Sequence, residues 1–145
     1  MKQILFLAIC AVAAVVFAAD NDANVKAELA KLQGTWQLTS AIKDGQPTPD
    51  EVVQKIRVVI KDSMHTVYFD KETIAKEIPF TIDPEKDPRA TDDKLPDGKI
   101  IRGIYKLDGD TLTSCVGTPD KDRPKEFAAG AGTGCTLRVF KRVKD

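Results

Sequence analysis

The first pattern along the chain is a continuous apolar run close to its start. Ile4 to Phe17 are all apolar and follow the positively charged Lys2. The run is too short for a stable membrane anchor, and Val16 and Ala18 suit the −3 and −1 positions of a cleavage site. We therefore predict that residues 1–18 are an export signal peptide, with an uncleaved membrane anchor as the alternative.

The hydrophobic period then indicates a short helix. Val25, Leu29 and Leu32 recur at spacings of four and three residues, which places them on one face of a helix over residues 21–33. Gly34 follows, and glycine commonly ends helices because it adopts a left-handed backbone easily. The apolar stripe is narrow, so we expect this helix to pack on a larger element.

After Gly34 the period changes to two residues. Trp36, Leu38 and Ser40 alternate with polar residues, as in a strand with one buried face. We expect further strands at 56–61, 66–70, 77–82, 89–93, 100–107, 111–116 and 135–143. Because these strands do not alternate with helices, the pattern predicts an antiparallel barrel or sandwich rather than a parallel sheet.

The connections between these strands carry typical turn residues. Asp44-Gly45 and Asp108-Gly109 favour tight turns, and the second is the stronger hairpin signal. Asp50 can cap a short helix through Lys55, and Asp62 to His65 would turn between two strands. Gly117 to Gly134 forms a long loop, and loops of this length are often functional.

Composition is consistent with a single exported domain over residues 19–145. The chain has 145 residues, with 22 basic and 22 acidic side chains and one histidine. A charge balance near zero argues against nucleic-acid binding, which needs a basic surface. We also expect no membrane span after signal cleavage, because no second apolar run is long enough.

The cysteines suggest one disulfide in the mature domain. Cys10 would be lost with the signal, which leaves Cys115 and Cys135. An even count in an exported chain favours a bridge, and both residues border adjacent predicted strands. Two free buried thiols are the alternative.

One short motif resembles a known superfamily. Gly34-Thr35-Trp36 stands at a helix-to-strand junction, and this looks like the first motif of the lipocalin and calycin proteins. The resemblance implies an up-and-down barrel of about eight strands that a short N-terminal helix closes at one end. It also implies that the Trp packs across the closed end against a basic residue of the last strand; the candidates are Arg138, Lys141 and Arg142.

A second resemblance covers nearly the whole mature chain. The segments 32–36, 103–112, 123–127 and 137–142 occur in the same order in a family of small exported bacterial domains that is expanded in planctomycetes. Gly103 to Leu112 and Arg123-Pro124-Lys125-Glu126-Phe127 are the specific parts. This family is uncharacterised, so the similarity implies an exported, periplasmic or extracellular, all-β domain without implying an activity.

The first hypothesis for function is a barrel that binds a small apolar or amphipathic ligand. An eight-stranded barrel has an interior just wide enough for side chains or one small molecule. The candidate interior residues are Trp36, Leu38, Phe69, Phe80, Tyr105 and Val139, with Ile78 and either Val67 or Tyr68 as further members. The same residues fit a filled core equally well, so the sequence leaves both possibilities open.

The alternative is a packed barrel that acts as a structural or protein-interaction module through the loop at 117–134. Phe127 in this polar loop either covers a barrel end or is offered to a partner protein. Arg123 in the same loop can pair with a carboxylate and fix the loop in place.

We expect no enzymatic activity, metal or cofactor. His65 lies in a predicted turn with Asp62 and Ser63, and close neighbours on one turn rarely assemble a catalytic triad. The acidic clusters lack the spacing of a calcium loop. The glycine-rich segment 130–134 lacks the preceding strand and following helix that phosphate-binding loops need.

Overall fold

The computed structural model describes residues 22–144. The predicted signal segment 1–18, with Cys10, lies outside the described residues. A helix over residues 22–32 comes first, close to the predicted range. The other elements are α2 (Asp50–Val53), β1 (Gly34–Lys43), β2 (Gln46–Pro47), β3 (Ile56–Lys61), β4 (Met64–Phe69), β5 (Glu72–Asp83), β6 (Arg89–Lys94), β7 (Ile100–Asp108), β8 (Thr111–Val116) and β9 (Thr136–Arg142).

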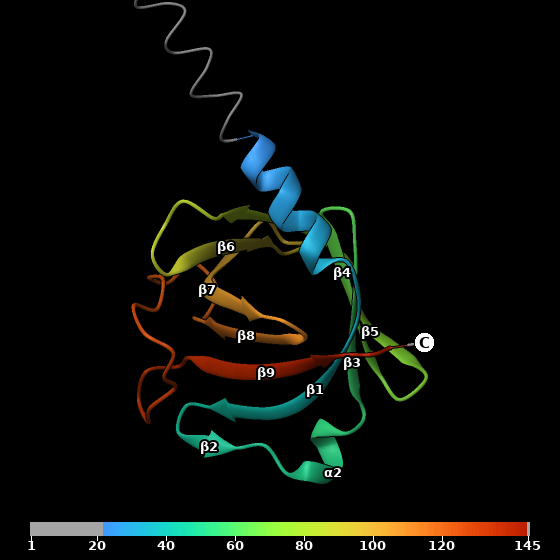
Figure 1. Ribbon diagram of the computed structural model, residues 1–145. Coiled ribbons are helices and arrows are strands. Elements are labelled where there is room, and N and C mark those ends of the chain that lie inside the picture. The colour runs from blue at the N-terminus through green and yellow to red at the C-terminus, as the bar shows by residue number, and fades with distance from the viewer. Residues whose placement is uncertain (1–21, 145) are drawn as a thin grey trace, which may run out of the picture.

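The strands form a closed antiparallel barrel (Figure 1). From β3 to β9 each strand pairs with the next along the chain, and β1 pairs with both β3 and β9. The pairing of β1 with β9 closes the ring, so the barrel contains eight strands in up-and-down order. β2 is an additional short strand beside β1. The predicted fold class, an all-β up-and-down barrel with a short N-terminal helix, is confirmed.

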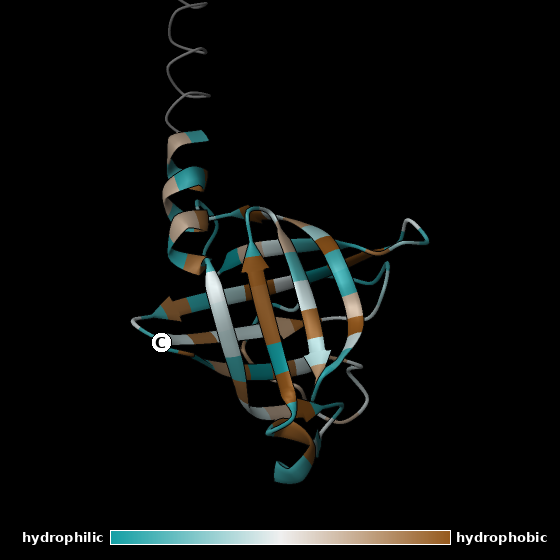
Figure 2. Ribbon diagram, turned by 90° about the vertical axis from the view of Figure 1, so that its right-hand side faces the viewer, coloured by the Kyte–Doolittle hydropathy of each residue, from teal (hydrophilic) through white to brown (hydrophobic). Residues whose placement is uncertain are grey.

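Hydrophobic side chains fill most of the barrel interior. Brown and teal bands alternate along several strands in Figure 2, as expected where one face of a sheet is buried. The core joins residues of the helix, α2 and the strands; its buried members are Leu32, Trp36, Leu38, Ala41, Val53, Ile60, Phe80, Tyr105, Leu112 and Phe140. One contiguous core of this kind is what a small single domain can build.

Register shifts in β1 and β5 change which residues face inward. In β1 the register with β9 shifts between Leu38 and Ser40, so Ala41 rather than Ser40 is the next buried residue. In β5 a shift accompanies the positive φ of Glu77, whose N–H donates to Thr66 Oγ1. An extra residue on one strand breaks the two-residue alternation, so simple alternation fails at both points.

The first strand is fastened to the helix by the lone tryptophan. Trp36 is fully buried, and its Nε1–H donates to the carbonyl oxygen of Leu32 at 2.9 Å. The Arg142 guanidinium lies 4.3 Å from the centre of the Trp36 ring. Its terminal nitrogens donate to the carbonyl oxygens of Gln33 and Lys31, at 2.6 and 2.7 Å. Of the three basic residues that the sequence offered, the structure selects Arg142.

Polar contacts attach the same helix to the far side of the barrel. Glu28 is buried, and its Oε1 accepts a hydrogen bond from the Tyr105 hydroxyl and pairs with Arg89, both at 3.3 Å. Burial, followed by the negative charge of Glu28, raises the pKa of Tyr105 well above its usual value. The helix therefore closes one end of the barrel, because it is bonded to strands on opposite sides of the ring.

The turn before His65 is shorter than the sequence suggests. Asp62 and Ser63 alone separate β3 from β4, and Asp62 has a positive φ. Its N–H and carbonyl oxygen are both bonded to the Gln33 side chain, which fixes the turn beneath the helix. The prediction that His65 lies in a turn is therefore wrong. His65 is in β4, opposite Ile60.

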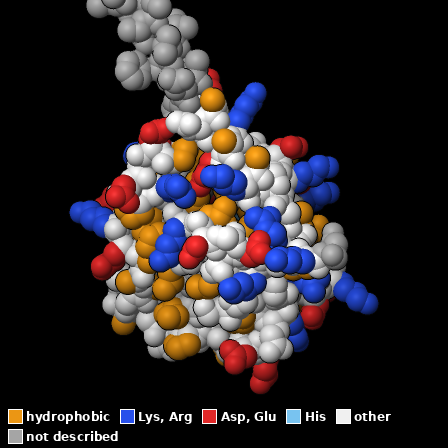
Figure 3. Space-filling view, in the orientation of Figure 1, with side chains coloured by type: hydrophobic (Ala, Val, Ile, Leu, Met, Phe, Trp, Pro, Cys, Tyr) orange, Lys and Arg blue, Asp and Glu red, His pale blue; other side chains and the backbone are white. Residues whose placement is uncertain are grey.

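The outer surface carries charges of both signs. Lysine, arginine and acidic side chains are interspersed over the face shown in Figure 3. Over residues 22–144, no helix has both the length and the apolar character needed to cross a bilayer.

The contacts of Arg142 predict its effect on stability. Arg142→Met removes three charge-assisted hydrogen bonds, two to backbone carbonyl oxygens and one to Asp110, together with a cation–π contact. We therefore expect the free energy of unfolding to fall by about 2–4 kcal/mol. Lys144→Met is the matched control, because Lys144 is exposed and its removal should change stability by less than about 0.5 kcal/mol. Urea denaturation measures both, and equal effects of the two variants would refute this role for Arg142.

Candidate ligand site inside the barrel

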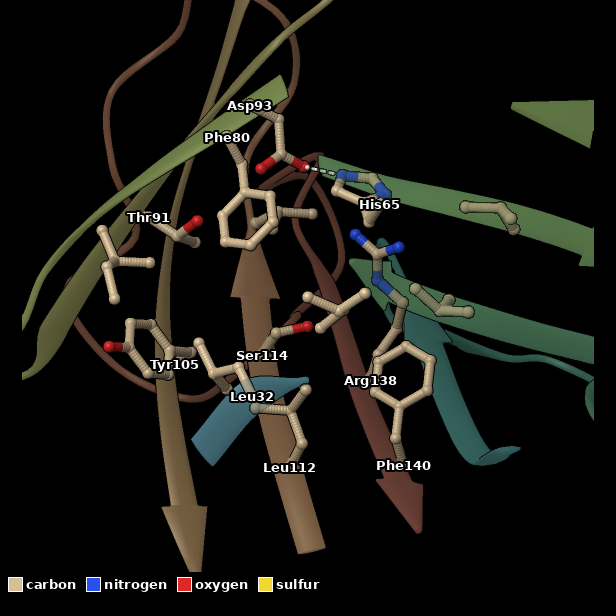
Figure 4. A pocket seen from close by; sticks show the side chains of 15 residues that line it. Leu32, His65, Phe80, Thr91, Asp93, Tyr105, Leu112, Ser114, Arg138 and Phe140 are labelled. Atoms are coloured by element: carbon tan, nitrogen blue, oxygen red, sulfur yellow. Dashed lines mark hydrogen bonds and ion pairs between the residues drawn. The ribbon is translucent and has the colours of Figure 1, made fainter. Parts of the chain in front are cut away.

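A cavity lies inside the barrel (Figure 4). Its volume is about 100 Å³, and the helix and seven of the eight barrel strands supply its walls. The apolar wall residues are Leu32, Val58, Ile60, Val67, Phe80, Ile82, Leu112, Val116 and Phe140. The polar wall residues are His65, Thr91, Asp93, Tyr105, Ser114 and Arg138. Side chains therefore do not fill the barrel interior completely.

The charged groups of the cavity lie away from the helix. On β9, Arg142 contacts the helix, whereas Arg138 is four residues earlier on the same strand. On β6, Arg89 contacts the helix, and Asp93 is four residues later. Four residues of strand span about 13 Å. The cavity is thus amphipathic, with Leu32 of the helix at its apolar end.

His65 and Asp93 are hydrogen-bonded to each other in this wall. His65 Nε2 lies 3.1 Å from Asp93 Oδ2, and both side chains are about one-fifth exposed. The ring also packs at a tilt against Phe80, with 5.8 Å between ring centres. His65 Nδ1 is buried and has no hydrogen-bond partner among the residues that the structure describes. Within this same part of the chain, no group of three potential metal ligands comes together.

Arg138 is a charged wall residue that has no ion-pair partner among the described residues. In Figure 4 its guanidinium points from β9 toward the His65 ring. Its Nε is buried and lacks a partner among residues 22–144, and the carboxylate of Asp93 is paired with His65 instead. Burial lowers the pKa of the Arg138 guanidinium, and the negative charge of Asp93 opposes this only in part. Protein surrounds the Arg138 side chain, and the surface that it leaves accessible faces the cavity.

Small neighbours create the space beside Arg138. Its partner in β1 is Ala41 and its partner in β8 is Ser114. Ala41 occupies this position because the bulge after Leu38 moves it to the inner face. Neither side chain is large enough to fill the space above the guanidinium, so the local sequence leaves a gap where a barrel core is normally close-packed.

The structure places four of the six predicted interior residues deep in the core. Trp36, Leu38, Phe80 and Tyr105 are buried, and the last two line the cavity. Phe69 lies at the end of β4, where Lys55 Nζ is 5.7 Å from its ring centre, and it does not line the cavity. Val139, the sixth predicted residue, does not line the cavity either.

Arg138, and not the expected Val139, faces the interior of the barrel. The residues of β9 that line the cavity are Arg138 and Phe140, so alternation turns Val139 to the outer face. The sequence pattern misled because Leu137 and Val139 form an apolar set on the outer side. His65, Asp93 and Arg138 were all missed as interior residues, and no signal in the chain marks them, since charged residues normally lie outside.

The long loop uses its distinctive residues within the molecule. Arg123 Nη1 donates to the carbonyl oxygens of Thr91 and Gly103, at 2.9 and 2.8 Å, and Nη2 lies 2.8 Å from Asp92 Oδ1. Phe127 does not cover a barrel end. It lies on the outer wall, with Lys106 Nζ 4.7 Å from its ring centre. The loop is therefore held against the side of the barrel.

The two mature-domain cysteines lie under and beside this loop as free thiols. Cys115 is fully buried, its Sγ lies 3.4 Å from the carbonyl oxygen of Ala128, and burial raises the pKa of its thiol. Cys135 is partly exposed. The structure thus lacks the bridge that the sequence predicts.

Comparison of the chain with known proteins gave no match to a family model, to a curated protein or to a solved structure. The functional argument therefore rests on the geometry of this barrel alone.

The burial of the cysteines predicts their reactivity. In a Cys10→Ser background, we expect one fast-reacting thiol in the native protein and two in denaturant, because a buried thiol with a raised pKa reacts slowly. Titration with a chromogenic disulfide reagent measures both, and Cys135→Ser should remove the fast phase. A chain without reactive thiols in denaturant would instead contain the disulfide.

Proposed function

We propose that this protein is a non-catalytic carrier or sensor that binds a small amphipathic molecule inside its barrel. The observation that carries the proposal is the internal cavity, whose wall is mostly apolar and holds its charged side chains away from the helix. Ligand sites in proteins commonly combine a mostly apolar wall with a few polar groups that orient the ligand.

The volume of the cavity limits the size of the ligand. An engineered apolar cavity of about 150 Å³ is known to bind benzene, so a space of about 100 Å³ accommodates roughly four to six non-hydrogen atoms. A longer molecule would need Leu32 or neighbouring side chains to move. We therefore expect the barrel to bind short molecules in preference to long-chain lipids.

Two further parts of the proposal come from the sequence. Residues 1–18 have the pattern of an export signal, so we place the site of action in the periplasm or outside the cell. The alternative role as a protein-interaction module through the 117–134 loop has less support. Arg123 and Phe127 are engaged with the barrel wall instead of with solvent.

The test is a titration with four-carbon amphiphiles of different charge. Butanol, butyramide, butyrate and butylamine are added to the protein while methyl NMR resonances of wall residues such as Val67, Ile82 and Leu112 are followed. At least one compound should shift these resonances saturably, with a dissociation constant in the millimolar range or below, as expected for a ligand this small.

A matched pair of variants locates the binding. Ser114→Phe places a bulky ring in the cavity, whereas Thr113→Phe changes the adjacent residue of β8, which is not part of the wall. Ser114→Phe should abolish the saturable shifts, and Thr113→Phe should leave them. If none of the compounds binds, or if Ser114→Phe changes nothing, the barrel interior is not a ligand site.

A further inference from the structure

The polar end of the cavity contains a buried hydrogen-bond donor that has no acceptor among the described residues. Arginine carries five N–H donors and accepts none. The Arg138 Nε is buried without a partner among the described residues, and the nearby carboxylate of Asp93 already accepts from His65. Leaving buried donors unpaired is costly, and it is more costly when the group is charged. The wall therefore lacks an acceptor opposite the guanidinium.

Among residues 22–144, the carboxylates nearest the cavity bond to groups other than Arg138. Asp93 is the one carboxylate among the wall residues, and it is paired with His65. The other buried acid in the described chain, Glu28, lies at the helix end and is paired with Arg89 and Lys31. No carboxylate of residues 22–144 forms an ion pair with Arg138. An external anion is thus the partner that this guanidinium lacks.

We propose that the ligand is a short-chain carboxylate, whose carboxylate group binds the Arg138 guanidinium while its hydrocarbon tail points toward Leu32. This rests on the proposed function of the barrel and names the class of ligand. A carboxylate matches the planar fork of an arginine, with which it forms two parallel hydrogen bonds. The tail then lies among the apolar wall residues, of which Leu112 and Phe140 are nearest the helix end in Figure 4.

The spacing along the barrel sets the length of the ligand. Arg138 and Leu112 lie on neighbouring strands, Ser114 pairs with Arg138, and Leu112 is two residues farther toward the helix. Two residues of strand span about 7 Å, close to the length of a chain of four or five carbons. Butyrate fits this span and the cavity volume, whereas a long-chain fatty acid exceeds both.

The decisive measurement compares butyrate with butyramide, which has the same shape without the charge. For the wild-type protein we expect butyrate to bind at least tenfold more tightly, by NMR titration. Arg138→Met should reduce butyrate affinity at least tenfold and leave butyramide affinity within threefold. Arg57→Met, on the outer face of β3, is the matched control and should change neither.

A second variant keeps the test independent of whether Arg138→Met folds. Asp93→Asn removes the negative charge next to the bound carboxylate and preserves the shape of the side chain. It should increase the preference for butyrate over butyramide several-fold, since like charges repel at short range in a buried site. An unchanged preference would overturn the role of Arg138 as the anion partner.

The outcomes separate this inference from the function on which it rests. If butyramide or butanol binds as tightly as butyrate, and Arg138→Met affects all of them alike, the barrel binds ligands but the carboxylate assignment is wrong. If none of these compounds binds, the proposed function itself fails. Tight, Arg138-dependent binding of butyrate supports both.

Discussion

Closure of the sheet by the pairing of β1 with β9 is the constraint on which the rest of the structure depends. Once the ring is closed, β1 and β9 no longer present free edges, and one face of every strand is turned inward. The interior must then be filled by side chains, water or a ligand. The helix over residues 22–32 and Arg142 fill one end, since Trp36 and Leu32 seal the ring beneath them.

The two ends of the barrel are stabilised by different physical means. At the helix end each buried polar group has a partner: Trp36 bonds to Leu32, Glu28 to Tyr105 and Arg89. Away from the helix, Arg138 and His65 retain buried nitrogen atoms that have no partner within residues 22–144. A protein that needed only stability would be served as well by apolar side chains here, because isolated buried charges are costly. The unpartnered nitrogen atoms at this end therefore lower the stability of the fold, as is common at functional sites.

The long loop at 117–134 is held against an apolar patch on the outer wall of the barrel. Ile104 and Cys115 are almost completely buried, although alternation turns both to the outer face of β7 and β8. The loop covers them, and Arg123 fastens it to the carbonyl oxygens of β6 and β7. At Ile104 and Cys115, β7 and β8 are consequently buried on both faces, whereas a half-exposed strand is buried on one. The barrel therefore has a second, smaller apolar layer under the loop.

The sequence by itself determined the order of the elements and the class of fold, because the two-residue period, the turn residues and the Gly34-Thr35-Trp36 junction are local features. It also found most of the interior, including Phe80 and Tyr105. Only the tertiary structure decided which face of β9 is inside. Leu137 and Val139 form an apolar, half-buried set on one face of β9, whereas Arg138 and Phe140 line the cavity on the other. The two-residue alternation therefore does not show which of these faces is inside. The bulge after Leu38 depends on the pairing of β1 with the distant β9, and the two-residue turn at Asp62 is bonded to the distant Gln33 side chain. For that reason the chain alone gave no sign that Arg138, Asp93 and His65 meet inside the barrel, which is a property of ring closure rather than of any segment.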